Sequence, residues 1–337
     1  MMFFFFLIFV LKYDLNNEFR MMGLLKKIFK GDDNFGIVVS HDEIFDLTGV
    51  QQYRPVLKLD IDSLIKAKPL LTQADPFLYV KGNTLYLFYE SQRSGARGLI
   101  RMMKTDNLAD WTEPLTVLQE PFHLSFPFVF DHCGSIYMIP ESQVTDSIRL
   151  YRGNEDLTGF TLEKILLSKP RTPDIKFNFC DSHILKKDNL FYLFTSVAYK
   201  WTYHLELYYT DDLLHHEFVK HPSSPIYVGN DFGRSGGSII HLDDYFYRIS
   251  QNCSKGYGGN ISLHRITALD ERKYGEELCF ENVLHTGGRV YRDGGHQLNV
   301  VKYNNEYIYA TDFRSVSWSW YQMYLKIRGK LRSFSAK

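Results

Sequence analysis

The 337-residue chain carries no excess of charge of either sign, because 39 acidic side chains balance 39 basic ones. A protein that binds nucleic acid through bulk charge usually has a basic excess, so no nucleic-acid partner is expected. Cysteine is scarce. The four cysteines, Cys133, Cys180, Cys253 and Cys279, lie far apart and form no C-x-x-C pair. We therefore expect buried free thiols, with no disulfide framework or zinc site, and a reducing, cytoplasmic location.

The N-terminus has an apolar run, residues 1–11, that is too short to cross a membrane, since a helical span needs about 20 residues. It lacks the basic start and the small-residue cleavage site of a signal peptide. Three interpretations are open: a weak anchor, a buried strand, or a translated upstream stretch with the true start at Met21 or Met22. Residues 22–30 are basic and amphipathic, which indicates a solvated leader helix or at most a peripheral membrane contact.

Nucleotide-binding motifs are also missing. The glycine-rich stretches 233–237 and 287–295 lack the Lys-Ser/Thr ending of a P-loop and the strand-to-helix context of a dinucleotide fold. Binding of nucleotides by either of those folds is therefore not expected.

Aromatic residues, in contrast, are abundant, and five tyrosines share the same surroundings: Tyr86, Tyr137, Tyr192, Tyr247 and Tyr307. Each lies in the second strand of a strand–turn–strand pattern. Eleven residues before them stand Asp75, Phe126, Asp181, Gly236 and His296. These strand–turn–strand units recur at similar intervals along the chain, which predicts an all-β fold, a five-bladed β-propeller. We expect an N-terminal extension over 1–34, the propeller over 35–328 and a tail over 329–337.

Propellers often close their ring by pairing an N-terminal strand with the last blade. The last repeat continues with one further strand candidate, Tyr321–Ile327, so we expect Phe35–Ser40 to complete blade five. Residues 41–70 would form a connector that contains a second strand candidate, 53–59.

The first strand of each blade lines the axis of a propeller, so Asp75, Asp181 and His296 are expected to converge there. Two carboxylates and an imidazole are suited to acid–base chemistry on a sugar. Alternatively, each aspartate only caps a neighbouring turn. His296 could hold a channel ion or water, although a lone histidine is usually only hydrogen-bonded. We expect no metal and no cofactor other than an activated sugar donor.

Further polar residues lie on loops that are expected to surround the mouth of the channel along this axis. They are Glu90, Arg93, Arg97, His123, Glu141, Arg234, Gln251, Tyr257 and Arg289. Arginines among glycines suit the recognition of phosphate or carboxylate groups. The alternative is a set of glycine-rich turns with surface arginines.

Several stretches resemble a known family: Asp75-Pro-Phe-Leu with Tyr86-Leu-Phe-Tyr-Glu90, residues 120–127 with Tyr137-Met-Ile-Pro-Glu-Ser142, and Arg234-Ser-Gly-Gly with 247–251. The chain resembles the N-terminal propeller domain of plant glucosamine inositolphosphorylceramide transferase and its stand-alone bacterial and viral relatives. That family is similar to the five-bladed propellers of glycoside hydrolase families 43 and 32.

The hydrolase resemblance implies that Asp75 is a general base or nucleophile and that Asp181 tunes a glutamic acid that protonates the leaving group. Blade four opens with Arg234-Ser-Gly-Gly and has no such glutamate, so Glu141 or Glu90 would have to replace it. No stretch matches the glycosyltransferase domain that follows the propeller in the plant protein, so a separate transferase is one expected partner.

Our leading hypothesis is a carbohydrate-active enzyme of surface-glycan or glycolipid biosynthesis that transfers a glycosyl group from an activated sugar. Asp75, Asp181 and Glu141 would be catalytic, and the other polar residues of the mouth would bind substrate. The alternatives are a hydrolase of the family 43 type, and a non-catalytic sugar-binding or scaffold propeller that partners a separate glycosyltransferase.

Overall fold

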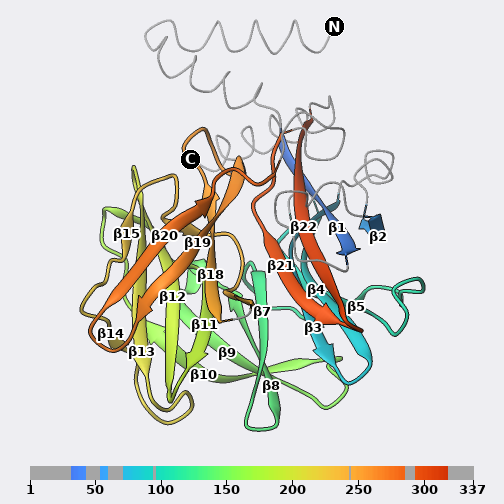
Figure 1. Cartoon of the computed structure of the whole chain (residues 1–337), viewed down its shortest axis with the longest axis horizontal. Coiled ribbons are helices and arrows are strands. Elements are labelled where there is room, and N and C mark those ends of the chain that lie inside the picture. The colour runs from blue at the N-terminus through green and yellow to red at the C-terminus, as the bar shows by residue number, and fades with distance from the viewer. Residues whose placement is uncertain are drawn as a thin grey trace, which may run out of the picture. The chain divides into compact units, whose positions relative to one another are not determined.

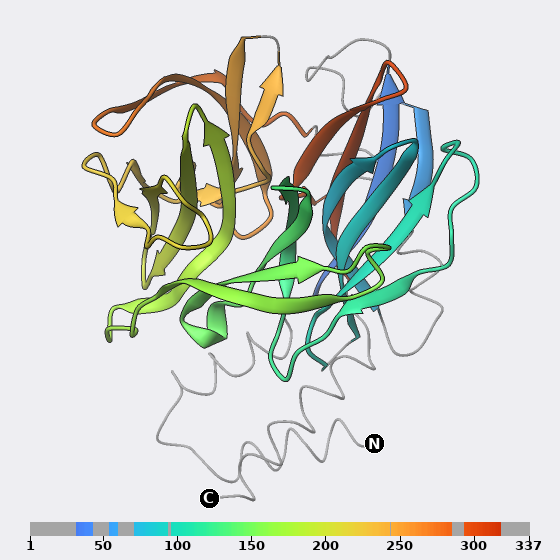
Figure 2. The same cartoon turned by 90° about the horizontal axis from the view of Figure 1, so that it is seen from below.

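Five antiparallel sheets follow one another along the chain in the computed structural model of the protein (Figure 1). The structure describes residues 32–42, 54–59, 71–93, 96–242, 244–284 and 293–317. Each sheet is one blade, and Figure 2 shows the blades arranged around a common axis. The all-β five-bladed propeller is thereby confirmed.

The blades lie in one compact unit, Asn34–Ser315; the other unit, Met1–Asp33 with Val316–Lys337, lies almost wholly outside the described residues. So do the leader segments, the strand expected at 321–327 and the tail. Among the described residues, no helix has the length and apolarity of a membrane span.

The first three blades have continuous first strands. Blade one consists of β3 (Leu71–Lys81), β4 (Thr84–Arg93), β5 (Leu99–Thr105) and β6 (Leu115–Leu118). Blade two consists of β7 (Ser125–His132), β8 (Ser135–Glu141), β9 (Ser147–Gly153) and β10 (Phe160–Ser168), with the short helix η1 (Gln143–Thr145) after β8. Blade three consists of β11 (Ile175–Lys187), β12 (Leu190–Tyr199), β13 (Tyr203–Thr210), β14 (Val219–Lys220) and β15 (Tyr227–Val228).

Blade four has an interrupted first strand, because β16 (Arg234–Ser235) and β17 (Ile240–Leu242) pair separately with β18 (Tyr245–Asn252). Two further strands, β19 (Asn260–Leu269) and β20 (Tyr274–Phe280), complete it. A side chain on Gly237 would lie 2.1 Å from the carbonyl oxygen of Leu298, so blade five approaches too closely here for any other residue.

Blade five is closed by the start of the described chain. Its order is β21 (Leu298–Tyr303), β22 (Glu306–Ser317), β1 (Asp32–Asp42) and β2 (Arg54–Leu59), and Figure 1 shows red β22 beside blue β1. The closure expected of Phe35–Ser40 is confirmed. The strand expected inside a connector is instead β2, the outermost strand of this blade, because it pairs with β1 from Ile37 to His41.

The hairpin register corrects the fifth copy of the repeat. The second strands begin at equivalent places, opposite the last residue of strand one: Thr84, Ser135, Leu190, Tyr245 and Glu306. The repeated tyrosine is the third residue of this strand in blades one to four, but the third residue of β22 is Ile308. The blade-five equivalent of Asp75 is therefore Gln297 and not His296. A slip of one residue matters, because neighbouring residues of a strand point to opposite faces.

Side chains from neighbouring blades form the core. Phe77 of blade one packs edge-on against Phe126 and Phe128 of blade two, and Phe88 packs against Phe160. The middle strands are covered on both faces, so eight consecutive residues of β12 are buried. The cysteines are free, as expected, but Cys180 alone is buried and Cys133 is exposed, since it lies on the β7–β8 turn.

Candidate functional site

The first strands of blades one to three share a distortion where they reach the axis. Asp75, Phe126 and Asp181 all have a left-handed backbone, with φ of 52°, 45° and 51°, and the strand register shifts at each of them. A bulge of this kind turns a side chain out of the regular pleat. Asp75 and Asp181 thus lie within their strands, and not at strand starts as the sequence predicts. Non-glycine residues adopt this conformation at a cost that is often tolerated at functional sites.

Asp75 belongs to a buried group of three side chains. Its Oδ1 lies 3.5 Å from Nε2 of His296, and Nδ1 of His296 lies 2.5 Å from Oδ2 of Asp312. Asp312 also accepts the backbone N–H groups of His296 and Asp75. The other oxygen of Asp75 accepts the N–H of Phe126, at 3.0 Å. Asp75 is therefore held by groups from blades two and five.

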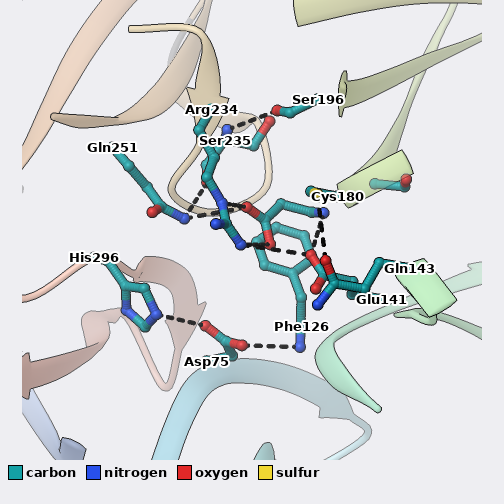
Figure 3. A network of polar contacts seen from close by, with 12 residues as sticks. Asp75, Phe126, Glu141, Gln143, Cys180, Ser196, Arg234, Ser235, Gln251 and His296 are labelled. Atoms are coloured by element: carbon teal, nitrogen blue, oxygen red, sulfur yellow. Dashed lines mark hydrogen bonds and ion pairs between the residues drawn. The ribbon is translucent and has the colours of Figure 1, made fainter. Parts of the chain in front are cut away.

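Asp181 is the centre of a second group. Nε of Arg234 donates to Oδ2 of Asp181, and Nη2 lies 3.3 Å from Oδ1. Gln251 donates to Oδ2 of the same carboxylate, at 3.2 Å. Glu141 accepts the backbone N–H of Asp181 and lies 3.6 Å from Nη2 of Arg234. Figure 3 shows Asp75, Glu141, Arg234, Gln251 and His296 pointing toward one another.

Tyr257 connects the two groups. Its ring lies 4.9 Å from the Arg234 guanidinium and 4.9 Å, edge-on, from the His296 ring. Tyr203 lies on the guanidinium at 5.7 Å, and Phe35 of β1 stacks on His296 at 4.5 Å. The aromatic rings therefore shield both cations of the site from water.

Glu90 is buried beside these groups, and among the described residues it has no cationic partner at close range. Its Oε1 lies 3.4 Å from Nε2 of His123, whose Nδ1 accepts the N–H of Gly98. Burial lowers the pKa of His123, which favours the neutral imidazole. Since Nδ1 is an acceptor, the proton of the neutral ring is on Nε2 and points toward Glu90.

The axis contains more carboxyl groups than cations. Asp75, Glu90, Glu141, Asp181 and Asp312 are all buried, and the cations among the axial groups described above are Arg234 and His296. Five carboxylates opposite two cations cannot all stay ionised away from water. Burial and the charge of Asp75 raise the pKa of Glu90 well above its usual value, and burial and the charge of Asp181 do the same for Glu141.

Burial also raises the pKa of Asp75, to about 6, although His296 opposes the rise. Burial alone would lower the pKa of His296, but the carboxylates of Asp312 and Asp75 outweigh it and raise this pKa to about 9. The site therefore combines Asp75, with a pKa of about 6, and His296, with a pKa of about 9, with the carboxyl groups of Glu90 and Glu141, whose pKa values burial raises well above the usual range. A carboxylate and a neutral acid in one site can act as general base and general acid.

Three of these residues have the chemical types of a metal site. Asp75, His296 and Asp312 offer ligand atoms within 4.8 Å of one another. A metal would require a neutral imidazole, whereas the two carboxylates hold His296 protonated. The three groups already form an ion triad, so they fit a metal poorly at neutral pH.

The sequence interpretation missed Asp312, because it aligned the repeats by their tyrosines. Alignment by the turns gives one buried polar residue per blade at the same place, six residues after the start of the second strand. These residues are Glu90, Glu141, Ser196, Gln251 and Asp312. The feature that could have given the correct alignment of blade five is the turn at Asn304 and Asn305. Both residues are left-handed, as in many two-residue hairpin turns.

Several residues of this ring connect blades. Glu141 accepts the N–H of Asp181 in blade three, Ser196 accepts the N–H of Ser235 in blade four, and Asp312 accepts that of Asp75 in blade one. These residues therefore stabilise the blade order as well as the site.

Not every residue expected at the mouth reaches this cluster. Arg93 and Arg97 are exposed, and no hydrogen bond or ion pair joins either side chain to the described axial groups. Arg289 lies outside the described residues. Glu90, His123, Glu141, Arg234, Gln251, Tyr257 and His296 do lie together with Asp75 and Asp181.

Among the solved structures similar to this chain are glycoside hydrolases. The chain is similar to Zg3597, a family 117 glycoside hydrolase of Zobellia galactanivorans, with a TM-score of 0.53, 11% identity, and 83% of this chain and 91% of that chain covered. A family 32 β-fructofuranosidase of Bombyx mori gives a TM-score of 0.53 at 16% identity, over 70% of this chain and 54% of that chain. At such identities the likeness shows the fold alone.

Sequence relatives are closer. Glucosamine inositolphosphorylceramide transferase 1 of Arabidopsis thaliana is 37% identical over 212 residues, which cover 60% of this chain and 26% of that protein. The protein of the same name from Oryza sativa subsp. japonica is 36% identical over 216 residues, 60% of this chain and 27% of that protein. The chain thus matches about a quarter of the length of these relatives.

The family model of the N-terminal part of glucosamine inositolphosphorylceramide transferase 1 matches residues 55–312. That range includes Asp75, Glu90, Glu141, Asp181, Arg234, His296 and Asp312, which are the charged residues of the axial cluster. The chain therefore belongs to the family of this N-terminal domain.

Proposed function

We propose that the axial cluster binds a sugar and performs acid–base chemistry on a glycosyl bond. The leading reaction is transfer from an activated sugar in the assembly of a surface glycan or glycolipid. The observation that carries this proposal is the buried set of five carboxyl groups around the two cations Arg234 and His296. The transferase names of the relatives support transfer as the first reaction to test.

Asp75 is the proposed base. It accepts only one backbone N–H through Oδ2, and its pKa of about 6 makes it an ionised but usefully basic group at neutral pH. In transfer it would take the proton of the acceptor hydroxyl while that oxygen attacks the donor sugar, and the leaving group would depart with the electron pair of the broken bond.

Glu90 is a better candidate than Glu141 for the acid. Oε2 of Glu141 already accepts the N–H of Asp181 and lies beside Nη2 of Arg234. Among the described residues, Glu90 faces only the neutral His123. Its partner on the neighbouring strand β3 is Ala74, the residue directly before Asp75. Asp181 would hold Arg234 in place. The guanidinium of Arg234 would meet a phosphate of the donor.

Glycoside hydrolysis is the second candidate, and the neutral Glu90 favours it. A glycosidase pairs a raised-pKa acid with a second carboxyl group, and Glu90 and Asp75 have this chemistry. A sugar-binding propeller that serves a separate cytoplasmic transferase is the remaining alternative, and it predicts binding without turnover.

The test starts with calorimetry of sugar nucleotides and oligosaccharides against the wild-type chain, followed by product analysis. Transfer releases the nucleotide and extends the acceptor, whereas hydrolysis creates a new reducing end. Asp75→Asn should keep the ligand affinity within a few-fold and lower turnover by about 100-fold or more, a usual size for loss of a general base. Activity of Asp75→Asn equal to that of the wild type would contradict the assignment.

The pH profile gives an independent check. A base must be ionised, so kcat/KM should rise with pH through about 6, and this limb should be absent in Asp75→Asn. Glu90→Gln should lose activity on substrates with poor leaving groups and keep it where the leaving group needs no proton. Glu141→Gln is the matched control, and the reverse pattern would transfer the acid role to Glu141.

A further inference from the structure

Several polar residues of the axial cluster lie toward one end of the blades. The polar ring residues Glu141, Ser196 and Gln251 lie near the C-terminal ends of β8, β12 and β18. The loops that follow these strands, residues 142–146, 200–202 and 253–259, therefore lie at the end that carries the site. We name the surface formed by these loops the mouth face.

The mouth face carries four exposed apolar side chains from three consecutive blades. Val144 is 47% exposed, Trp201 87%, Val228 52% and Tyr257 38%. Val228 joins them because β15 pairs with His204 and Leu205 at the start of β13, next to the 200–202 loop. We name these four residues the apolar crescent. Single exposed apolar residues are ordinary, but four on neighbouring loops of one face indicate a contact surface.

Trp201 projects furthest and is held on a well-bonded turn. The N–H of Tyr199 donates to the carbonyl of Thr202, and Asn230 donates to the carbonyl of Trp201, at 2.9 and 3.0 Å. The N–H of Lys200 donates to the carbonyl of Asp174, and the two side chains form an ion pair. Because the turn is fixed, Trp201 can enter a contact with little loss of backbone entropy.

Charge is distributed unequally between the two ends of the blades. On the mouth face, Lys176 and Lys255 are exposed without an acidic partner among the described residues, while Asp174 is already paired with Lys200. Asp146 is likewise paired with Arg171. The turns at the opposite end carry the acids Asp131, Glu155, Asp156 and Asp270, the pairs Asp211–His216 and Asp212–His215, and the bases Arg272 and Lys273. An anionic surface would therefore accept the mouth face and repel the other end.

We propose that the apolar crescent docks on a phospholipid bilayer that contains anionic lipids, with Trp201 at headgroup level. Tryptophan prefers this region because its ring is apolar and its N–H is polar. The lysines between the apolar residues favour a bilayer over a protein partner, since lysine is depleted in protein interfaces and attracted to anionic lipids. The inference rests on the proposed function only in that it places the candidate site on the side of the propeller that faces the membrane.

The test measures vesicle binding, which needs no catalysis. The full chain is mixed with vesicles of phosphatidylcholine alone or with added phosphatidylserine, and binding is followed by co-sedimentation. Wild type should bind the anionic vesicles more tightly, and added salt should weaken the binding. Trp201→Ala should bind about tenfold more weakly, because an aromatic side chain no longer leaves water.

Tyr245→Ala is the matched control, since Tyr245 is a 48% exposed aromatic at the opposite end of blade four. It should bind like the wild type. Lys255→Glu should weaken binding to anionic vesicles and leave neutral ones unaffected. Equal binding of Trp201→Ala and wild type would overturn the proposal, and so would the absence of binding to either vesicle. An inactive Asp75→Asn chain that still binds vesicles would separate docking from the proposed function.

Discussion

His296 and Asp312 show how the axial residues determine one another's charge. Asp312 accepts three backbone N–H groups, those of His296, Gln297 and Asp75, at 2.7, 3.1 and 3.3 Å, and also contacts the His296 ring, so it is well solvated by the protein. Its charge keeps His296 protonated, and the two together adjust Asp75. Asp312, a residue of blade five, thus influences the proposed base both through His296 and through the hydrogen bond that it accepts from the backbone N–H of Asp75.

This arrangement predicts a pH-dependent stability. The pKa of His296 rises from 6.5 to about 9 on folding, so its contribution is fully present below about pH 6.5 and is lost as pH rises through 9. The free energy of unfolding, measured in urea from pH 6 to 9.5, should fall across this range. In His296→Gln the fall should be smaller, whatever the stability of the variant at pH 6.

Asp312→Asn provides the matched comparison. Loss of the Asp312 charge lowers the pKa of His296, so the pH-dependent fall should shrink or move to lower pH. A slope in both variants equal to that of the wild type would show that His296 is not held as an imidazolium.

At the scale of elements, the two halves of the site are supported differently. Asp75 and Asp181 lie on long strands, whereas Arg234 lies on β16, which has two residues. The support for β16 comes from the fully buried Arg248 of β18. Arg248 forms a bidentate ion pair with Glu276 of β20 and donates to the carbonyl of Phe232, two residues before Arg234.

Removal of one partner of this pair should be strongly destabilising. Arg248→Met leaves Glu276 buried without its cation, and such a change usually costs about 3–5 kcal/mol of unfolding free energy. The double variant Arg248→Met, Glu276→Leu should recover much of the loss, because no buried charge remains. Urea unfolding of the two single variants and the double variant gives the coupling.

Arg265 and Glu277 on the neighbouring positions of β19 and β20 form an exposed control pair, 35% and 51% exposed. Arg265→Met should change stability by less than about 1 kcal/mol. Equal costs for Arg248→Met and Arg265→Met would contradict a special role for the buried pair.

In the whole molecule, the ring of five blades is closed by β1, which is far in sequence from the strands β21 and β22 of the same blade. β1 lies between β22 and β2 in blade five, and Ile37 and Val39 are fully buried there. Phe35 of the same strand also stacks on His296. The segment that closes the propeller therefore also forms part of the site.

Ile37→Ala should accordingly destabilise the whole propeller, by about 2–5 kcal/mol, as truncation of a core side chain does. Because each blade is buried by its neighbours, the loss should appear in a single unfolding transition. Leu162→Ala, at a 47% exposed position of an outer strand, should change little. A separate early transition of blade five, by fluorescence or calorimetry, would be evidence against cooperative closure.

The sequence by itself determined the number of blades, the hairpins and the closing strand, because these depend on local patterns: aromatic alternation, turn residues and a regular spacing. It also identified Asp75, Asp181 and Glu141, since the repeat places them on the axis. It could not show which residues form ion pairs or which carboxyl groups are protonated. The pairing of Arg234 with Asp181, the neutral Glu90 and the link from Asp312 to His296 and Asp75 depend on contacts between blades.

Those contacts could be read only from the tertiary structure, and there are two physical reasons for this. A one-residue difference in register moves a side chain between the axis and the core. Alignment of blade five on Tyr307 introduced such a difference, and Asp312 was therefore not recognised as a residue of the axis. The ionisation of a carboxyl group also depends on how many other charges are buried beside it, and the sequence does not state this. Burial of five acids around two cations is a property of the closed ring.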